Sequence, residues 1–262
     1  MLEVINADLN LSHKTLLQDV SLNVAAGEFL AVCGPNGAGK SSLMRLISGE
    51  LKPSTGDVRW HGHSLAEWPL LKLARQRALM QQRAEVGFDY SALEIILLGR
   101  HPHHQGASRP QDIQIALAAL QEVDAGHLAE QIYTTLSGGE QARIQMARVL
   151  AQIWETSAGP RLLLLDEPTA ALDPRQQHRI LEIARRWANK GDVAVIAIVH
   201  DLNLAAQYAD RIALMRDGRL QALGDVGSIM TPAAVEACFD LPCILLSHPD
   251  GGTPMIAARR QH

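Results

Sequence analysis

Residues 29–49 read FLAVCGPNGAGKSSLMRLISG, and this stretch decides the fold. Phe29–Cys33 is an apolar run with the length of a buried parallel strand. The glycines and the proline of Gly34–Gly39 cannot continue a strand, so a loop is predicted there. The next segment begins at Ser41 and has the apolar spacing of a helix that ends at Gly49; its apolar residues are Leu43, Met44, Leu46 and Ile47.

This predicted strand, loop and helix carry the pattern G-x-x-x-x-G-K-S of a phosphate-binding loop, the P-loop. Glycines let backbone N–H groups close around the β- and γ-phosphates of a nucleotide, and the helix N-terminus adds about half a positive charge. We expect Lys40 to reach the terminal phosphates and the Ser41 hydroxyl to bind Mg²⁺. The predicted nucleotide-binding residues of the loop are Gly34, Pro35, Asn36, Gly37, Ala38, Gly39, Lys40, Ser41 and Ser42.

Charge and composition limit the classes of partner. The net charge of the 262 residues is −4 and the chain has no long basic run, which argues against nucleic acid as the main partner. Three cysteines lack the spacing of a metal site, and Cys33 lies in the predicted buried strand, so a reducing cytosolic environment is favoured. Glu3 and Asp8 stand where a signal peptide would be basic and then apolar, so none is expected. No apolar run reaches the roughly 18 residues of a membrane span.

Regular alternation of apolar residues predicts antiparallel strands ahead of the P-loop, over Leu2–Asn10 and Gln18–Val24. A short strand is predicted over Gly56–Trp60. Ser64–Leu79 has leucine and arginine at helical spacing, which predicts a helix.

Residues from about 87 to 150 are predicted to be all-helical and inserted into an α/β frame. Ser91 and Glu94 form a capping box that opens a helix ending at Gly99. Pro110 starts a second helix, and Glu140–Gln152 forms a third. The predicted apolar face of the second helix contains Ile113, Ala116, Leu117, Leu120 and Val123.

The α/β frame resumes with two apolar runs, Arg161–Leu165 and Val193–Val199, which predict buried strands. Asp217-Gly218 predicts the turn of a hairpin near the end of the chain.

Two carboxylates, Asp166 and Glu167, follow the first of these strands, at the edge where α/β sheets place their ligands. Asp166 would hold Mg²⁺, and Glu167 would polarise the water that attacks the γ-phosphate. Solvated acids at a strand end are a common alternative, and the P-loop upstream favours the functional interpretation.

The sequence LSGGEQ at residues 136–141 opens the third helix, so Ser137, Gly138 and Gly139 would present N–H groups and a positive helix end to an anion. The alternative is a plain N-cap with flexible glycines. The order of P-loop, LSGGEQ and LLLLDEP resembles that of ATP-binding-cassette (ABC) ATPases over essentially the whole chain.

This resemblance implies an α/β P-loop NTPase (RecA-like) core with an N-terminal antiparallel β subdomain and an inserted all-helical subdomain. Residues 1–262 would form a single ABC ATPase domain, in which 1–86 and 153–262 are the core and 87–152 the helical signature subdomain. ATP and Mg²⁺ would be the cofactors. Two copies would form a head-to-tail dimer in which each ATP lies between one P-loop and the partner's LSGGEQ loop.

Further residues match motifs of the family. Gln82 matches the Q-loop glutamine that contacts Mg²⁺ and the attacking water, with Gln81 as the alternative. Asp173 matches the D-loop near the nucleotide, and His200 matches the switch histidine near the γ-phosphate. The aromatic side chain that stacks on adenine would fall at residues 11–13, where only His13 offers a substitute. The resemblance thus implies Glu167, His200 and Gln82 as catalytic residues, and Ser41, Gln82 and Asp166 as Mg²⁺ ligands.

The segment from Leu98 to His103 resembles importers of iron chelates, haem and cobalamin, and residues 147–160 look most like haem importer ATPases. His101, His103 and His104 are therefore expected to have a surface or docking role, with metal or haem ligation as the alternative. The implied partners are a membrane permease, a second copy of the chain and, indirectly, a periplasmic substrate-binding protein. The chain would lie on the cytoplasmic face of the inner membrane. Ferric siderophore or cobalamin import, and a soluble ABC ATPase acting on nucleic acid, remain alternatives.

Overall fold

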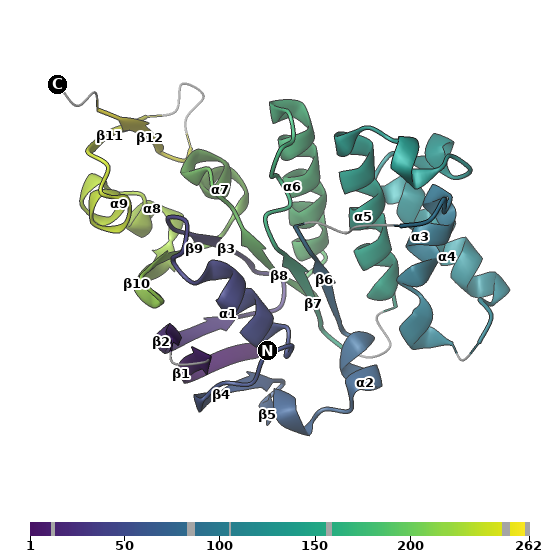
Figure 1. The fold of residues 1–262 in the computed structure, drawn as a ribbon. Coiled ribbons are helices and arrows are strands. Elements are labelled where there is room, and N and C mark those ends of the chain that lie inside the picture. Colours follow the sequence, from purple (N-terminus) through teal and green to yellow (C-terminus); the bar gives the residue numbers. More distant parts are fainter. Residues whose placement is uncertain (12–13, 83–86, 105, 156–158, 248–251, 260–262) are drawn as a thin grey trace. The chain divides into compact units, whose positions relative to one another are not determined.

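The computed structural model describes residues 1–11, 14–82, 87–104, 106–155, 159–247 and 252–259. The described chain forms two compact units (Figure 1). The first unit consists of Met1–Glu67 and Ile196–His262, and the second consists of Trp68–Val195.

The N-terminal part of the first unit is an antiparallel sheet with the strand order β2-β1-β4-β5. These strands are β1 (Leu2–Leu11), β2 (Lys14–Val24), β4 (Thr55–Trp60) and β5 (His63–Ser64). Leu2 pairs with Val24 and Val4 pairs with Leu22, so the alternating apolar residues face the same side and are buried. The predicted antiparallel strands are confirmed.

The first unit also contains the P-loop strand. The neighbours in its sheet are β10-β9-β3-β8, in that order: β3 (Phe29–Cys33), β8 (Val193–Ile198), β9 (Arg211–Arg216) and β10 (Arg219–Asp225). The unit boundary falls within β8. Asp217 and Gly218 join β9 to β10 with φ angles of 51° and 76°, as a two-residue hairpin turn requires. The predicted hairpin is confirmed.

Helices complete the first unit. The helices are α1 (Lys40–Ile47), α7 (Leu202–Tyr208), α8 (Val226–Ile229) and α9 (Pro232–Phe239), with a 3₁₀ turn, η1, at Leu65–Glu67. A small hairpin of β11 (Cys243–Leu246) and β12 (Met255–Ala258) follows them. All three cysteines are buried and free, and burial raises the pKa of Cys33 to about 12, so its thiol stays protonated.

The second unit combines two parallel strands with a group of helices. Strand β6 (Arg77–Met80) pairs with β7 (Arg161–Leu165), and β8 follows β7 in the sheet. The helices are α2 (Leu70–Ala74), α3 (Ala92–Leu98), α4 (Pro110–Glu122), α5 (Gly138–Gln152) and α6 (Pro174–Ala188). The 3₁₀ turns η2 (His101–His103), η3 (Gly126–Leu128) and η4 (Tyr133–Thr135) lie between them.

Helices α3, α4 and α5 pack against one another, as Figure 1 shows. The capping box of Ser91 and Glu94 at the start of α3 is confirmed, because the Glu94 carboxylate accepts the Ser91 N–H at 2.8 Å. The α/β organisation with an N-terminal antiparallel sheet and an inserted helical segment is confirmed. The limits 87–152 for a helical subdomain stay a prediction.

One prediction of local structure was wrong and another was wrong in part. Ser64–Leu79 is not one helix: α2 is short and the chain then enters β6, because Ala78 and Leu79 pair with Leu163 and Leu164 of β7. The buried face of α4 agrees only in part with the predicted one. Ala116, Leu120 and Val123 are buried as predicted. Ile113 and Leu117 are 41% and 43% exposed, whereas Ile115 and Asp112 are buried.

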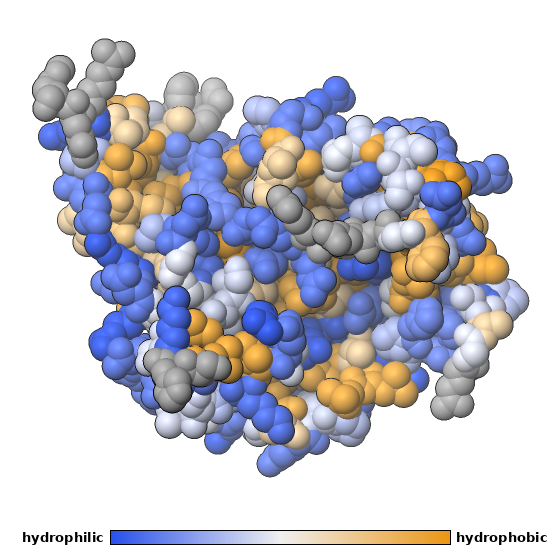
Figure 2. All heavy atoms as spheres, in the orientation of Figure 1, coloured by the Kyte–Doolittle hydropathy of each residue, from blue (hydrophilic) through white to orange (hydrophobic). Residues whose placement is uncertain are grey.

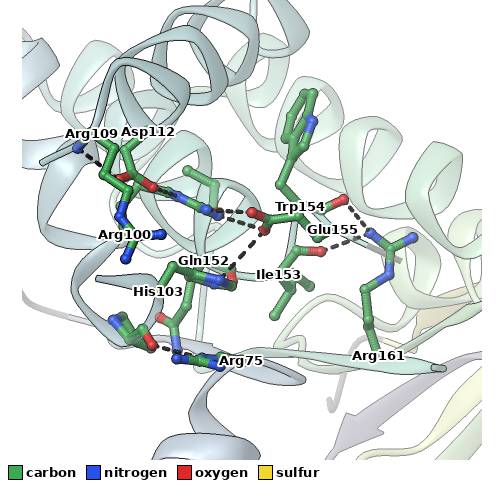
Figure 3. Close-up of polar contacts among 12 residues, drawn as sticks. Arg75, Arg100, His103, Arg109, Asp112, Gln152, Ile153, Trp154, Glu155 and Arg161 are labelled. Carbon is green, nitrogen blue, oxygen red and sulfur yellow. Dashed lines mark hydrogen bonds and ion pairs between the residues drawn. The ribbon is translucent and has the colours of Figure 1, made fainter. Parts of the chain in front are cut away.

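Asp112 is buried because it pairs with a buried arginine. The Arg100 guanidinium, 1% exposed, donates to Asp112 Oδ1 at 3.0 Å and to both carboxylate oxygens of Glu155 (Figure 3). Burial alone would raise the pKa of Asp112, but hydrogen bonds from the Arg109 N–H and from Arg100 lower it on balance.

Replacing Arg100 by leucine is therefore expected to lower the free energy of unfolding by about 3–5 kcal/mol, since both carboxylates would lose their buried partner. Urea unfolding of the full chain measures this loss. Arg59→Leu is the control, because the exposed pair of Arg59 and Asp57 adds little. Equal losses in the two variants would contradict the importance that we give to burial.

Candidate active site

The P-loop leaves β3 at Gly34, as predicted, and enters α1 at Lys40, one residue before the predicted start at Ser41. A Cβ at Gly34 would lie 2.2 Å from the carbonyl oxygen of Met215, so only glycine fits. Gly39 has a φ of 96°, and a Cβ there would lie 3.0 Å from the carbonyl oxygen of Leu16. The loop is therefore held by close backbone contacts that exclude larger residues.

The start of α1 suits an anion. No side chain among the described residues caps its N-terminus and its first turn has no acidic residue, so its N–H groups and its positive end are open. Lys40 is 5% exposed, and its Nζ donates to the carbonyl oxygens of Gly34 at 2.8 Å and Pro35 at 2.9 Å. Its ammonium group thus lies within the loop itself. This loop fits the phosphates of a nucleotide.

His200 lies in the same unit as the P-loop. It follows β8, and the N–H of the preceding Val199 donates to the carbonyl oxygen of Val32 in β3 at 3.1 Å. The ends of the two neighbouring strands therefore bring His200 and Gly34 to one edge of the sheet. His200 is exposed there. Asp201 next to it caps α7 by accepting the N–H groups of Asn203 and Leu204.

In the second unit, Gln82 and Glu167 come together. Met80 pairs with Leu165, and the Asp166 N–H donates to the Met80 carbonyl at 2.8 Å, so both segments leave the sheet at one edge. Gln82 Nε2 donates to Glu167 Oε2 at 2.5 Å. The backbone of Glu167 has a φ of 52°, an unusual conformation for a non-glycine residue. The carboxylate is therefore held by its own backbone and by the Gln82 amide.

A cavity of about 310 Å³ opens beside this pair. The end of β6, the segment after β7 and the first turns of α5 line this cavity. Its lining is Met80, Gln81, Gln82, Tyr133, Gly138, Gln141, Ala142, Gln145, Glu167, Pro168, Ala170, Ala171 and Leu172. The cavity thus joins Glu167 to the LSGGEQ segment within the second unit.

The LSGGEQ loop opens α5 as predicted, with Ser137 as the N-cap. Glu140 accepts the Ser137 N–H at 2.9 Å and the Ser137 hydroxyl at 2.6 Å. Both hydrogen bonds lower the pKa of Glu140, and the one from the hydroxyl has the larger effect. Gln141 donates to the carbonyl oxygens of Tyr133 and Leu136 and so fixes the approach to the loop.

Asp173 caps α6, since its carboxylate accepts the Gln176 N–H at 3.1 Å. Gly139 approaches the same helix: a Cβ at Gly139 would lie 2.8 Å from Cγ of Gln176. The second glycine of LSGGEQ therefore allows α5 to approach the start of α6.

The predicted site residues fall into two sets. Gly34–Ser42 and His200 belong to the first unit, whereas Gln82, Asp166, Glu167, Ser137–Gly139 and Asp173 belong to the second. Sequence reasoning missed Glu140 and Gln141, which hold the LSGGEQ loop; the S-x-x-E spacing of Ser137 and Glu140 is the capping-box signal that would have found the first. The candidate for adenine stacking, His13, lies outside the described residues.

The histidine cluster is not uniformly at the surface, which corrects the surface part of the expectation, and its docking role stays a prediction. His101 is exposed, but His103 is 13% exposed at its side chain and lies 2.7 Å from the carbonyl oxygen of Gln152. Both ring nitrogens of His104 are buried. Within the described residues, no group of three or more His, Cys, Asp or Glu side chains is arranged to hold a metal ion. Across the residues that the structure describes, no helix has the length and apolar character to cross a membrane.

Known proteins match most of this chain. The family model described as ABC transporter matches residues 17–170. The chain is 79% identical, over 99% of its length and 97% of the relative's, to the hemin import ATP-binding protein HmuV of Methylobacillus flagellatus. It is 47% identical to the protein of that name from Pseudomonas entomophila, over 99% of the chain and all of the relative.

Solved structures with the same fold include transporter subunits. A chain from the inward-facing structure of a metal-chelate type ABC transporter matches with a TM-score of 0.84 and 27% identity, over 99% of this chain and 97% of that one. A dimeric bacterial ABC transporter cassette, MJ0796, matches with a TM-score of 0.74 and 26% identity, over 86% of this chain and 98% of that one.

Proposed function

Because this chain belongs to the ABC transporter family, we propose that it is the ATP-hydrolysing subunit that powers haem uptake through a partner permease. As a member of that family it binds and hydrolyses ATP. The observation that carries the catalytic part is the hydrogen bond from the Gln82 amide to the Glu167 carboxylate at the cavity wall. The choice of haem rests on the 79% identity to a relative named for hemin import.

ATP would lie with its phosphates on the P-loop. The open N–H groups at the start of α1 and the Lys40 ammonium would bind the β- and γ-phosphates, which need both hydrogen bonds and positive charge. His200, at the end of the neighbouring strand, would donate a hydrogen bond from its ring to the γ-phosphate. These residues bind and orient the nucleotide but do not activate water.

Mg²⁺ would be held by Ser41, Gln82 and Asp166. A hydroxyl, an amide oxygen and a carboxylate are the hard oxygen ligands that this ion prefers, so the donor set fits. Bound Mg²⁺ would neutralise charge on the phosphates and hold them in line for attack.

Glu167 would act as the general base. One oxygen of its carboxylate would accept a proton from the attacking water. The other oxygen, Oε2, would accept the hydrogen bond from the Gln82 amide, which fixes the orientation of the carboxylate. A positioned carboxylate of this kind typically contributes about 10²–10⁴-fold to the rate.

The second copy of the chain would complete the site. Ser137, Gly138 and Gly139 lie at the N-terminus of a 15-residue helix, whose positive end suits a γ-phosphate presented by a partner. A two-fold axis would give each dimer two such composite sites, with Asp173 at the contact between copies.

The other partners would be a permease and, through it, a periplasmic substrate-binding protein, so the chain would lie on the cytoplasmic face of the inner membrane. Exposed apolar side chains of the second unit support a docking surface: Leu70 is 83% and Phe88 is 73% exposed. Figure 2 shows hydrophobic atoms at the surface over α2 and over the α3–α4 region.

The proposed cargo is tested on the complex that co-purifies with the tagged, full-length chain from its native membranes. In liposomes we expect ATP-dependent uptake of haem, and no comparable uptake of a ferric siderophore or cobalamin. Uptake of a ferric siderophore or cobalamin without uptake of haem would refute haem as the cargo. Co-purification of ribosomes or DNA without a membrane protein would favour the nucleic-acid alternative.

A further inference from the structure

The C-terminal end of α5 is fixed by a cluster of polar contacts that the proposed mechanism does not use (Figure 3). We call Arg100, His103, Gln152 and Glu155 the α5 joint. In addition to its carboxylate partners, Arg100 donates from Nη1 to the carbonyl oxygen of Ala151 at 2.6 Å. The guanidinium thus ties the end of α3 to the last turn of α5.

His103 makes the second link. Its Nε2 lies 2.7 Å from the carbonyl oxygen of Gln152, so this nitrogen carries the proton, and its Nδ1 lies 3.7 Å from Glu155 Oε2. Burial is the main cause that lowers the pKa of His103, which keeps the ring neutral beside the charged Arg100. The η2 turn is therefore fixed to the same end of α5.

Gln152 makes the third link. Its Nε2 donates to the carbonyl oxygens of Ala74 at 2.8 Å and Arg77 at 2.9 Å, which are the last residue of α2 and the first of β6. Arg75, between them, donates to the carbonyl oxygen of Pro102 in η2 at 2.7 Å. A single glutamine therefore contacts η2 through its backbone and the start of β6 through its side chain.

Strand β6 connects the contacts of Gln152 to the candidate catalytic residues. The strand runs from Arg77 to Met80, and two residues later Gln82 donates to Glu167. Only an amide at position 152 supplies two N–H donors to two carbonyls with no charge to bury. Loss of this side chain would remove the link from the end of α5 to the start of β6, while the contact of Arg75 with η2 would stay, and no residue proposed to bind ATP would be touched.

We propose that Gln152 is a positioning residue that makes the α3–η2 segment and β6 move as one body, so that a displacement of the segment by the permease reaches Gln82. This inference rests on the proposed function, because it assumes that a permease contacts the segment. Packed side chains and hydrogen bonds that run continuously between two elements are the physical means by which such a displacement is transmitted.

The first experiment needs no permease. In the full-length chain, Gln152→Leu is expected to raise amide hydrogen exchange in residues 77–82, because the carbonyl oxygens of Arg77 at the start of β6 and of Ala74 just before it each lose a hydrogen bond. Gln207→Leu, at an exposed glutamine of α7, is the matched control and should leave exchange there unchanged. Unchanged exchange in Gln152→Leu would overturn the link between Gln152 and β6.

The second experiment uses the complex purified with its permease. ATP hydrolysis by the isolated Gln152→Leu subunit should stay within a few-fold of wild type. Its stimulation by the permease should fall about tenfold, a typical size for coupling between sites. Gln152→Glu should lose as much, since a carboxylate faces the two carbonyl oxygens. Equal losses in isolated and permease-stimulated hydrolysis would show a structural role only and overturn the inference.

The stimulation by the permease is measured without cargo, so the result does not depend on the identity of the cargo. Absence of haem uptake by the wild-type complex would refute the proposed cargo and leave the inference standing. Retained stimulation in both Gln152 variants, with haem uptake by wild type, would refute the inference alone.

Discussion

Glu167→Gln is expected to lower ATP turnover by roughly 10²–10⁴-fold, the usual contribution of a general base. The amide has the shape of the carboxylate and can still accept the hydrogen bond from Gln82, but it cannot take a proton from water. ATP affinity should change little, because the P-loop that binds the phosphates is in the other unit and is untouched.

This variant should also remain in an ATP-bound dimer, since the step that ends the bound state is blocked. Size-exclusion chromatography with ATP and Mg²⁺ would show the dimer, and a phosphate-release assay would give the rate. Glu182→Gln, at an exposed carboxylate of α6, is the control and should hydrolyse ATP normally. Hydrolysis near the wild-type rate in Glu167→Gln would remove Glu167 from the role of base.

Much of the site could be predicted because its parts have local signals. A strand, a glycine-rich loop and a helix are adjacent in the chain, so the P-loop needs no distant contact to be recognised. The Ser137 cap and the carboxylates after β7 are likewise defined by neighbours within a few residues. In the structure, each of these segments forms the expected type of element.

Features that depend on pairing across the chain could not be predicted in this way. The four residues of β6 include Arg77 and follow a helical pattern, and they form a strand because β7 lies beside them. The buried face of α4 has the same kind of cause: Asp112 is inside because Arg100, twelve residues earlier, is inside too.

The same limit applies to the chemistry of the site. Gln82 and Glu167 are 85 residues apart, and their hydrogen bond follows from the parallel pairing of β6 and β7. The link from Gln152 to Ala74 and Arg77 spans more than 70 residues. Periodicity reports which face of an element is buried, but not which distant polar group meets it there.

Ser137→Arg is expected to abolish ATP hydrolysis while ATP binding by the single subunit stays largely intact. Ser137 is exposed at the N-terminus of α5, and an arginine would fill the space in which a partner's γ-phosphate must approach the helix. Thr134→Arg is a matched control, because Thr134 is exposed three residues earlier and receives the same charge. Nucleotide-binding titrations and phosphate release measure the two properties separately.

Mixing Ser137→Arg with Lys40→Ala subunits tests whether each site is shared between two copies. Neither variant alone should hydrolyse ATP, since one lacks the loop that caps the nucleotide and the other the P-loop lysine. A mixed dimer, however, pairs the intact P-loop of the first with the intact Ser137 of the second. Half of the dimers would be mixed and each would have one working site, so about a quarter of the wild-type rate should return if the two-fold arrangement holds. No recovery on mixing, together with lost ATP binding in Ser137→Arg alone, would place Ser137 in the site of its own subunit.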